Sequence, residues 1–306
     1  MKNVGVSVQA RLKNLSRETG MDMPSLLRRY VQERLLYRVS VSGHADRFVL
    51  KGGLLLAAYS DGELSRPTED IDFNGLDRGG GVEELRAMLV EVLSSPSEDD
   101  GVEFDLSSMT VAKDRTGIVP GGKVVMAARL GTARVDLRID VGFGNPVTPG
   151  VKVIEFPSLL SGLAPVPTAT SYPLETVIAE KVHAMAQFGL RNTRIKDYFD
   201  ILLLSRRHSF DGDLLADAIA NTFAHQQRAI DPEMPALGEA FARTAGSAWK
   251  KFVSKLRSDM PDDLADAVEE VSSFLAPALE AARSGLRNGT TWEPGSGWQP
   301  SGPAPR

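Results

Sequence analysis

The stretch KGGLLLAAYSDGELSRPTEDID, residues 51–72, decides the fold of this chain. It follows a short apolar segment at 48–50, which predicts a strand, and it opens with the pair Gly52-Gly53. The apolar residues at 54–59 predict a short helix, after which a polar turn leads to Asp70-Ile71-Asp72-Phe73. This last segment predicts a second strand, so the stretch as a whole predicts a strand–glycine–helix–turn–strand unit.

Two aspartates share one face of the second predicted strand, because side chains alternate between the faces of a strand. Asp70 and Asp72 lie on that face. Neighbouring carboxylates repel each other, and a hard cation such as Mg²⁺ or Mn²⁺ relieves the repulsion and also binds nucleotide phosphates. A lone Asp-x-Asp is common in solvated loops, whereas its combination with the glycine pair, Arg66 and Thr68 is more specific for a nucleotide site.

The glycine pair favours phosphate binding. Glycine lets a ligand approach the backbone closely, and the N–H groups of a helix that starts there face an anion. The glycine-rich segment at 75–81 lacks the lysine and the spacing of a P-loop, so we interpret it as a flexible connection.

Composition excludes several classes of protein. With 306 residues, 42% apolar and 25% charged, the chain can form one large or two small globular domains. It has no cysteine, which excludes disulfides and thiolate metal sites. We find no apolar run long enough to span a membrane and no apolar signal segment, which fits a cytoplasmic protein.

Charge is unevenly distributed along the chain. The net charge is −5, but residues 1–51 hold ten Lys and Arg against four Asp and Glu, a difference of +6. A local basic surface attracts RNA even on an acidic protein. The alternative is that these charges only solvate helix faces.

The remaining patterns predict an α/β (α+β) architecture, with a mixed sheet followed by a mostly helical half. The expected domains are 1–165, an α/β domain with N-terminal helices, 166–284, a helical domain, and 285–306, a disordered tail rich in Gly, Pro and Ser. Trp292 and Trp298 in the tail have no assigned place. The predicted helices are 6–20, 24–40, 82–93 and a run from 174 to 284; the further predicted strands are 104–106, 124–130, 135–141 and 151–156, and 165–173 is expected to be a loop.

A third carboxylate is expected from the strand at 135–141. Its apolar residues alternate with Asp136, Arg138 and Asp140, which share the opposite face. Either aspartate suits a metal ligand or a general base by alternation alone. The alternative is a surface aspartate paired with Arg138.

A fourth group of charged residues follows in the helical segment 175–204. Lys181 can neutralise a triphosphate, and Asp197 and Asp200 are three residues apart on one helix face. Arg191, Arg194 and Lys196 add positive charge for a polyanion. Without further information the segment also fits an amphipathic helix pair with a charged face.

Three of these stretches, 51–72, 137–149 and 175–204, resemble motifs of the AbiEii/AbiGii toxin family, within the polymerase-β-like nucleotidyltransferase superfamily. The family includes the toxins of mycobacterial nucleotidyltransferase toxin–antitoxin systems. The resemblance covers about residues 20–205. Where the superfamily often has Gly-Ser, this chain has Gly52-Gly53, so backbone N–H groups replace the serine hydroxyl; the glycine pair is usual in the AbiEii branch.

The resemblance implies an active site and its residues. It favours Asp140 as the third carboxylate and includes Lys181 with the Lys196, Asp197 and Asp200 cluster, without deciding between the two aspartates. The implied catalytic residues are Asp70, Asp72, Asp136, Asp140, Lys181, Asp197 and Asp200; the implied metal ligands are Asp70, Asp72 and Asp140; the implied nucleotide-binding residues are Lys51, Gly52, Gly53, Arg66, Thr68 and Lys196.

The resemblance also implies a function. The family's toxins transfer NMP from an NTP to the 3′ acceptor end of tRNA, which blocks translation and growth, as in phage defence. It implies a cognate antitoxin, AbiEi-like or kinase-like, and we expect a monomer without membrane association. Two alternatives are transfer to a protein or small-molecule hydroxyl, and a non-catalytic nucleotide-binding abortive-infection module.

Thr68 carries a separate hypothesis. It lies two residues before Asp70, so its phosphorylation would add negative charge beside the metal and compete with the nucleotide. The alternative is a threonine that only stabilises the turn.

Overall fold

The computed structural model describes residues 4–60, 66–75, 81–114, 121–256 and 259–301. The chain forms two compact units. The first combines the residues up to Asn145 with Lys152–Ser171, and the second combines Pro146–Val151 with the residues from Tyr172 onwards. The division therefore falls at 171/172, a few residues beyond the predicted domain boundary at 165/166, and the short segment at 146–151 belongs to the second unit.

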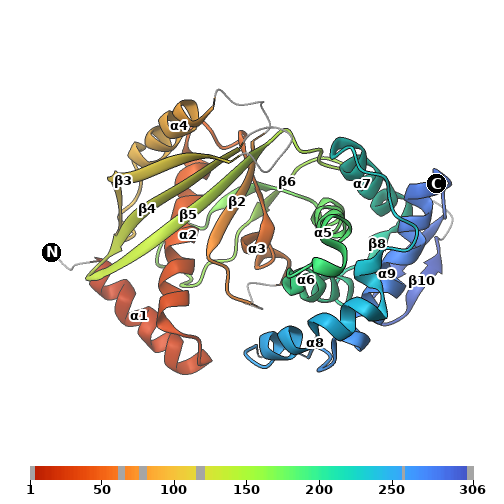
Figure 1. Ribbon diagram of the computed structural model, residues 1–306. Helices are drawn as coiled ribbons and strands as arrows, with labels where there is room; N and C mark the ends of the chain where they lie inside the picture. Colours follow the sequence, from red (N-terminus) through yellow and green to blue (C-terminus); the bar gives the residue numbers. More distant parts are fainter. Residues whose placement is uncertain (1–3, 61–65, 76–80, 115–120, 257–258, 302–306) are drawn as a thin grey trace. The chain divides into compact units, whose positions relative to one another are not determined.

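The first unit contains a seven-stranded mixed sheet (Figure 1), which confirms the predicted fold class. The strand order is β3-β4-β5-β2-β1-β7-β6. The strands are β1 (Phe48–Lys51), β2 (Asp70–Gly75), β3 (Val102–Asp114), β4 (Gly121–Leu130), β5 (Ala133–Phe143), β6 (Lys152–Glu155) and β7 (Thr168–Ser171), and the helices are α1 (Val4–Thr19), α2 (Met23–Val41), α3 (Gly52–Leu55), η1 (Ala58–Ser60) and α4 (Val82–Ser94).

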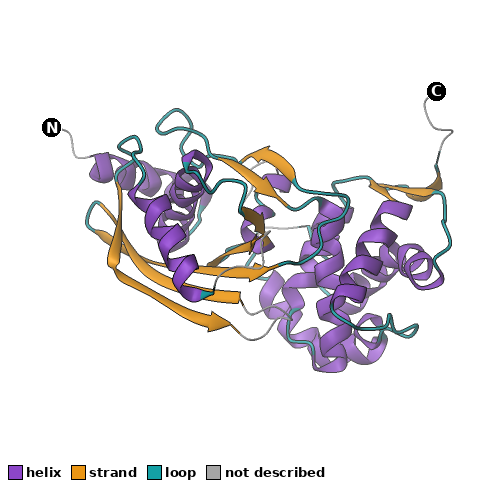
Figure 2. Ribbon diagram, turned by 90° about the horizontal axis from the view of Figure 1, so that it is seen from above, coloured by secondary structure: helices purple, strands orange, loops and turns teal. Residues whose placement is uncertain are grey.

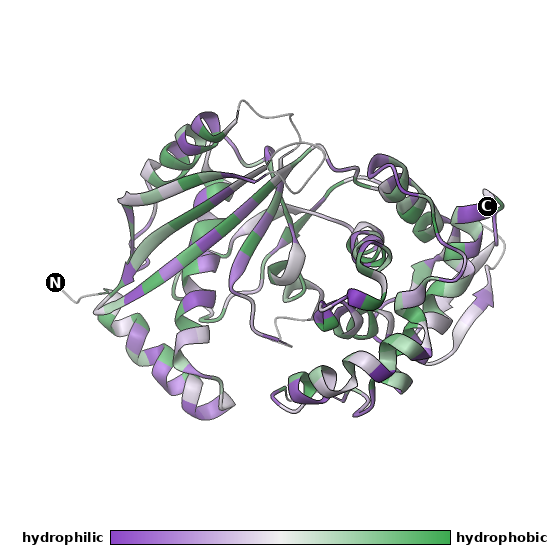
Figure 3. Ribbon diagram, in the orientation of Figure 1, coloured by the Kyte–Doolittle hydropathy of each residue, from purple (hydrophilic) through white to green (hydrophobic). Residues whose placement is uncertain are grey.

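One face of this sheet is apolar and covered by helices. In β5, Leu137 and Ile139 are fully buried while Asp136 and Arg138 are exposed, and hydrophobic and hydrophilic residues alternate along the strands in Figure 3. Helices α2 and α4 pack on the strands, and Figure 2 shows helices stacked against one side of the sheet. The polar face of β5 is therefore the face opposite helices α2 and α4.

Strand β2 lies between β1 and β5. It pairs antiparallel with β1, where Lys51 is opposite Asp72, and parallel with β5, where Asp72 is beside Asp140. The predicted strands at 48–50 and 70–73 thus become neighbours in the middle of the sheet.

The second unit is mainly helical, as predicted for residues 174–284. It also contains a small sheet of order β10-β9-β8. Its elements are α5 (Leu174–Phe188), η2 (Gly189–Arg191), α6 (Ile195–Ser205), β8 (Phe210–Asp211), α7 (Gly212–His225), η3 (Pro235–Leu237), α8 (Glu239–Val253), α9 (Leu264–Ser284), β9 (Thr290–Glu293) and β10 (Gly297–Pro300). No helix in the described parts of the chain is long and apolar enough to cross a membrane.

Several local predictions differ from the structure in their bounds or type. The helix expected at 54–59 is the four-residue α3, which begins at Gly52, followed by η1 at Ala58–Ser60. The expected loop at 165–173 contains β7, which pairs in parallel with β1. Strand β3 continues beyond 104–106 through an irregularity between Asp105 and Thr110, where the Asp105 carboxylate accepts hydrogen bonds from Ser107. Residues 76–80 of the predicted glycine-rich connection lie outside the described residues.

The predicted disordered tail was also wrong for most of its length. Strands β9 and β10 form a hairpin that pairs with β8. Trp292 and Trp298 contact the ring of Phe274, and their indole N–H groups donate to the carbonyls of Ser205 and Phe274 at 2.7 and 3.1 Å. Two anchored tryptophans supply the apolar contact that the composition of the tail does not suggest.

The basic N-terminal segment is less exposed than its charge suggests. Arg29, Arg34 and Arg38 of α2 are at most 6% exposed. Arg34 pairs with the buried Glu33, and Arg38 binds both carboxylate oxygens of buried Asp100 at 2.6 and 3.1 Å. Burial lowers the pKa of Arg29 to about 10. These three cations hold the first unit together and are not available to RNA.

Candidate active site

The first residue of the glycine pair, Gly52, is required by the side chain of Asp72. Gly52 has a φ of +67°, and a Cβ placed on it would lie 2.0 Å from Oδ2 of Asp72. Only glycine combines that backbone conformation with space for the carboxylate. The pair therefore permits close packing of Asp72 onto the backbone, in addition to any role in phosphate binding.

Gly53 brings two more of the predicted residues into the site. A Cβ on Gly53 would lie 2.8 Å from Oγ1 of Thr68 and 3.1 Å from both terminal nitrogens of Arg66. The Thr68 hydroxyl donates to the carbonyl of Asp70 at 3.4 Å. Arg66 and Thr68 are thus beside the glycine backbone and the start of β2. Helix α3, with a single turn, contributes much less of a helix dipole than the predicted longer helix.

The strand register separates the two candidates for the third carboxylate. Asp140 is the direct neighbour of Asp72 on β5. Asp136 precedes the part of β5 that pairs with β2; its side chain is 70% exposed and pairs with Arg134 at 3.4 Å. Asp140, whose side chain is 39% exposed, is therefore the one that the fold brings to Asp72.

The surroundings of Asp140 contain two charged residues that the sequence patterns did not indicate. Lys123 on β4 lies opposite Asp140, and its Nζ is 3.9 Å from Asp140 and 3.4 Å from Asp114. Burial raises the pKa of Asp140; Lys123 and Arg138 oppose this rise, whereas Asp70 and Asp114 add to it. Only the register of β4 against β5 reveals Lys123, because its spacing in the sequence carries no signal.

The carboxylates fit a divalent cation whose remaining ligands come from the phosphates of the substrate. Among the residues that the structure describes, no group of three acidic or imidazole side chains is arranged as a preformed metal cage. Mg²⁺ is usually held by one or two carboxylates together with substrate phosphates, so such a cage is not needed. Asp70 and Asp140 repel each other, and a bound cation would relieve this repulsion.

The predicted lysine cluster is in the second unit. Lys181 of α5 is 9% exposed, and its Nζ donates to Asp197 at 3.0 Å and to Asp200 at 2.5 Å. Asp200 is fully buried, and Arg194 donates to the other oxygen of Asp197 at 3.0 Å. Both aspartates thus orient the ammonium, and the pair packs α5 against α6. Lys196 and Arg191 are exposed.

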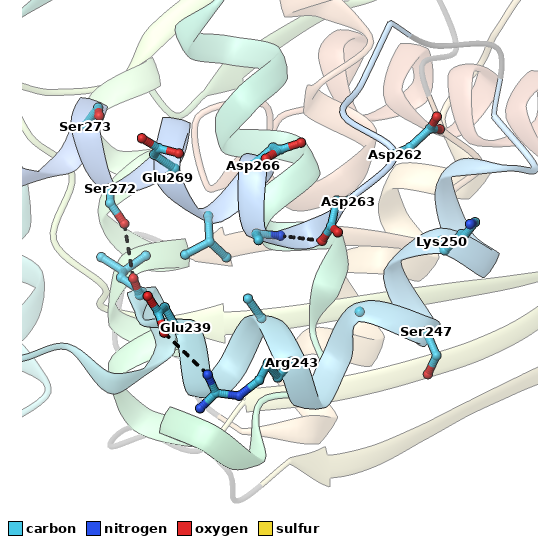
Figure 4. Close-up of a pocket in the computed structure, with 15 residues that line it drawn as sticks. Glu239, Arg243, Ser247, Lys250, Asp262, Asp263, Asp266, Glu269, Ser272 and Ser273 are labelled. Carbon is cyan, nitrogen blue, oxygen red and sulfur yellow. Dashed lines mark hydrogen bonds and ion pairs between the residues drawn. The ribbon is translucent and has the colours of Figure 1, made fainter.

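A separate groove of about 1070 Å³ lies between α8 and α9 (Figure 4) and contains none of the predicted site residues. Carboxylates outnumber cations along it. Glu239, Asp262, Asp263, Asp266 and Glu269 line it together with Arg243 and Lys250, and Arg243 pairs with Glu239. Its chemistry does not suit a nucleotide phosphate.

A mixed sheet whose central strand presents Asp70 and Asp72 beside Asp140 and a glycine backbone defines a nucleotidyltransferase. The chain belongs to the AbiEii family: the model for the nucleotidyl transferase AbiEii toxin of type IV toxin–antitoxin systems matches residues 34–281. Both the enzyme class and the resemblance predicted from the sequence are thereby confirmed. A comparison with curated proteins found no match.

A solved structure shares the fold of this chain. The nucleotidyltransferase toxin MenT4 from Mycobacterium tuberculosis H37Rv is 19% identical, with a TM-score of 0.54 over 90% of this chain and 99% of that one. A putative nucleotidyltransferase from H. pylori is 18% identical, with a TM-score of 0.47 over 87% of this chain and 97% of that one.

Proposed function

We propose that this toxin-family enzyme transfers NMP from an NTP to the 3′ acceptor end of tRNA, with a divalent metal. The observation that supports the reaction is the register of β2 and β5, which sets Asp72 beside Asp140 above the backbone of Gly52. The tRNA acceptor is the part of the proposal that extends beyond the family assignment.

The first group of residues binds the reacting phosphates in this proposal. Asp70, Asp72 and Asp140 would hold Mg²⁺ or Mn²⁺, which neutralises triphosphate charge when bound. Arg66, Lys51 and the N–H groups of the glycine pair orient the phosphate oxygens. Thr68 supports the backbone at Asp70, to which its hydroxyl donates.

The second group supplies fixed positive charge. Lys181 is held by Asp197 and Asp200, which limits its rotamers and leaves a positioned point charge. Lys196 is exposed and adds charge that is not neutralised within the described residues. Removing Lys181 would also leave the buried Asp200 without this partner, so its role in catalysis is inseparable from its role in packing.

The proposed step is an in-line displacement. The acceptor 3′ hydroxyl oxygen forms a bond to the α-phosphorus, the bond from that phosphorus to the bridging oxygen breaks, and pyrophosphate leaves. The hydroxyl proton passes to Asp140. Positioning and charge neutralisation account for the acceleration, as in phosphoryl transfer generally.

The family implies a partner as well. A type IV toxin–antitoxin system includes an antitoxin, which we propose to be AbiEi-like or kinase-like. A tRNA acceptor implies action in the cytoplasm, and loss of aminoacylatable tRNA would stop growth, which suits phage defence. We propose that the enzyme acts as a monomer.

The test is transfer of label from each NTP in turn to bulk tRNA with Mg²⁺. Wild type and Asp136→Asn are expected to label the tRNA 3′ end at similar rates. Asp72→Asn and Asp140→Asn are expected to lose at least about 100-fold, the scale for one electrostatic group in a transition state.

Each outcome has a distinct meaning. Labelling of a protein but not of tRNA would replace the acceptor in this proposal. Equal activity of Asp136→Asn and Asp140→Asn would contradict the assignment of Asp140. Toxicity that persists in Asp72→Asn without any transfer would favour a non-catalytic role.

We further propose that Thr68 is a site of phosphorylation. Its Oγ1 lies where a Cβ of Gly53 would contact it, so a phosphate there would occupy the proposed triphosphate position. Mass spectrometry after co-expression with the antitoxin is expected to show modified Thr68. Consistently unmodified Thr68 would contradict this.

A further inference from the structure

The link between α5 and α6 is a compact, ordered turn. Helix α5 ends at Gly189, whose φ is +50° and whose N–H donates to Met185. The N–H of Asn192 then donates to the carbonyl of Gly189, and the side chain of Asn192 accepts from the N–H of Arg194 at 2.8 Å. These bonds order the backbone of the link between the two helices.

Two large apolar side chains of this link face solvent. Phe188 is 41% exposed and Leu190 is 49% exposed. Phe188 has no ring contact with another described residue, unlike the phenylalanines of the core of this unit. An exposed aromatic ring at the end of a helix offers a face on which a base can stack.

Exposed cations lie close to these apolar residues in the sequence. Residues 187–196 contain Arg191, Arg194 and Lys196 and no acid, and all three cations are exposed. Arg191 and Lys196 have no ion pair within the described residues, and Arg194 pairs only with Asp197. Arg228 joins the group, because it donates to the carbonyl of Ala186 at 3.3 Å.

We propose that this surface, formed by Phe188, Leu190, Arg191, Arg194, Lys196 and Arg228, binds single-stranded RNA at the acceptor end of the substrate. Phosphates contact the four cations, and a base stacks on Phe188 beside Leu190. The inference rests on the proposed function and names the surface that recognises its acceptor. Arg194 links this surface to the Lys181 cluster through Asp197.

The positive charge of this surface favours RNA over a protein as its ligand. Four exposed cations on or beside a short link that also carries an exposed aromatic side chain suit a phosphate backbone with unstacked bases. The groove between α8 and α9 in the same unit carries more carboxylates than cations and would repel the same ligand. Within the N-terminal segment, Arg29, Arg34 and Arg38 are buried and are not available to RNA, whereas Arg11, Lys13 and Arg17 are exposed.

The experiment measures binding of a hairpin RNA with a single-stranded 3′ end, and of the same hairpin with a blunt end, by fluorescence anisotropy across KCl concentrations. Arg191→Gln with Arg228→Gln is compared with Arg243→Gln with Lys250→Gln, an equal loss of charge from the groove. The first double variant is expected to bind at least about 10-fold more weakly. It is also expected to lower the slope of log affinity against log salt by about 1.4, because each of the two lost phosphate contacts contributes about 0.7.

Phe188→Ala tests the stacking. It is expected to weaken binding of the single-stranded end about 10-fold and to leave the blunt hairpin unchanged, because base–aromatic stacking needs an unpaired base. Thermal stabilisation of each variant by NTP with Mg²⁺ is measured in parallel, and it is expected to match the wild type, which shows that the variants are folded and bind nucleotide.

The outcomes separate this inference from the proposed function. Wild type that labels tRNA, with all variants binding RNA equally, would overturn the surface but leave the reaction in place. Wild-type protein that binds neither the hairpin with the single-stranded end nor the blunt hairpin would overturn both the surface and the proposed function. Variants that bind RNA normally but lose the antitoxin would show that the surface serves a protein partner instead.

Discussion

Gly52 shows how one residue sets the position of a carboxylate. Replacing it with alanine adds a Cβ at 2.0 Å from Asp72 Oδ2 and strains a backbone with φ of +67°. Gly52→Ala is expected to lose at least about 100-fold in nucleotide transfer. Gly162→Ala is the matched control, because Gly162 also has a positive φ but nothing lies within 4 Å of its Cβ.

The measurement is the transfer rate beside the free energy of unfolding in urea. Both variants are expected to lose about 1–2 kcal/mol of stability from backbone strain, and only Gly52→Ala to lose activity. Loss of activity in both would assign the effect to strain alone.

His183 makes the free energy of unfolding depend on pH. Burial lowers its pKa, with a further contribution from Arg228, while Glu180 opposes the shift; its ring packs edge-on to Phe223. The unfolded chain then binds more protons below about pH 6.5 than the native state, so stability falls as the pH drops below that value. His183→Gln is expected to flatten the dependence of the urea midpoint on pH between 5 and 7, and an unchanged slope would contradict this.

At this scale the sequence predicted some residues of the candidate site and did not decide others. Asp70 and Asp72 follow from alternation within a strand, which is local. The choice between Asp136 and Asp140 depends on the register of β5 against β2, and Lys123 depends on the register of β4. Register is set by packing between distant segments, which a single sequence does not display.

At the scale of elements, α2 is held by buried ion pairs as well as by its buried apolar residues. Arg38→Met would leave Asp100, which is 2% exposed, without its cation. We expect this variant to lose about 3 kcal/mol of unfolding free energy, the scale for an uncompensated buried charge. Arg17→Met, at an exposed position of α1, is the control and is expected to change it by less than about 0.5 kcal/mol.

The measurement is urea unfolding followed by far-ultraviolet circular dichroism. Equal stability of the two variants would show that Arg38 is solvated in the native state.

The elements that the sequence predicted best are those with long apolar periodicity, such as α2, α5 and β5. The missed strands are short. Thr-Ala-Thr-Ser in β7 and Thr-Thr-Trp-Glu in β9 have no apolar alternation, and they are strands only because β1 and β8 are beside them. Pairing with a neighbour, rather than propensity, determines such segments.

At the scale of the whole molecule, the two units have separate cores, and all three tryptophans lie in the second. Trp249 is fully buried there, and Trp292 and Trp298 pack on Phe274. Tryptophan fluorescence therefore reports on the second unit alone.

This arrangement predicts that Arg38→Met, in the first unit, lowers the circular dichroism midpoint in urea and leaves the fluorescence midpoint unchanged. Multi-unit chains commonly depart from a single transition. A fluorescence midpoint that shifts by the same amount would show that the chain unfolds as one cooperative body.

The C-terminal hairpin has a consequence for the order in which the second unit is made. Strand β8 at Phe210–Asp211 pairs with β9 at Thr290–Glu293, so its partner leaves the ribosome only after α7, α8 and α9 have been synthesised. Domains fold as units as their residues emerge. A nascent chain released before residue 290 would expose Phe274 and an unpaired β8, which makes it a substrate for chaperones and proteases rather than an active toxin.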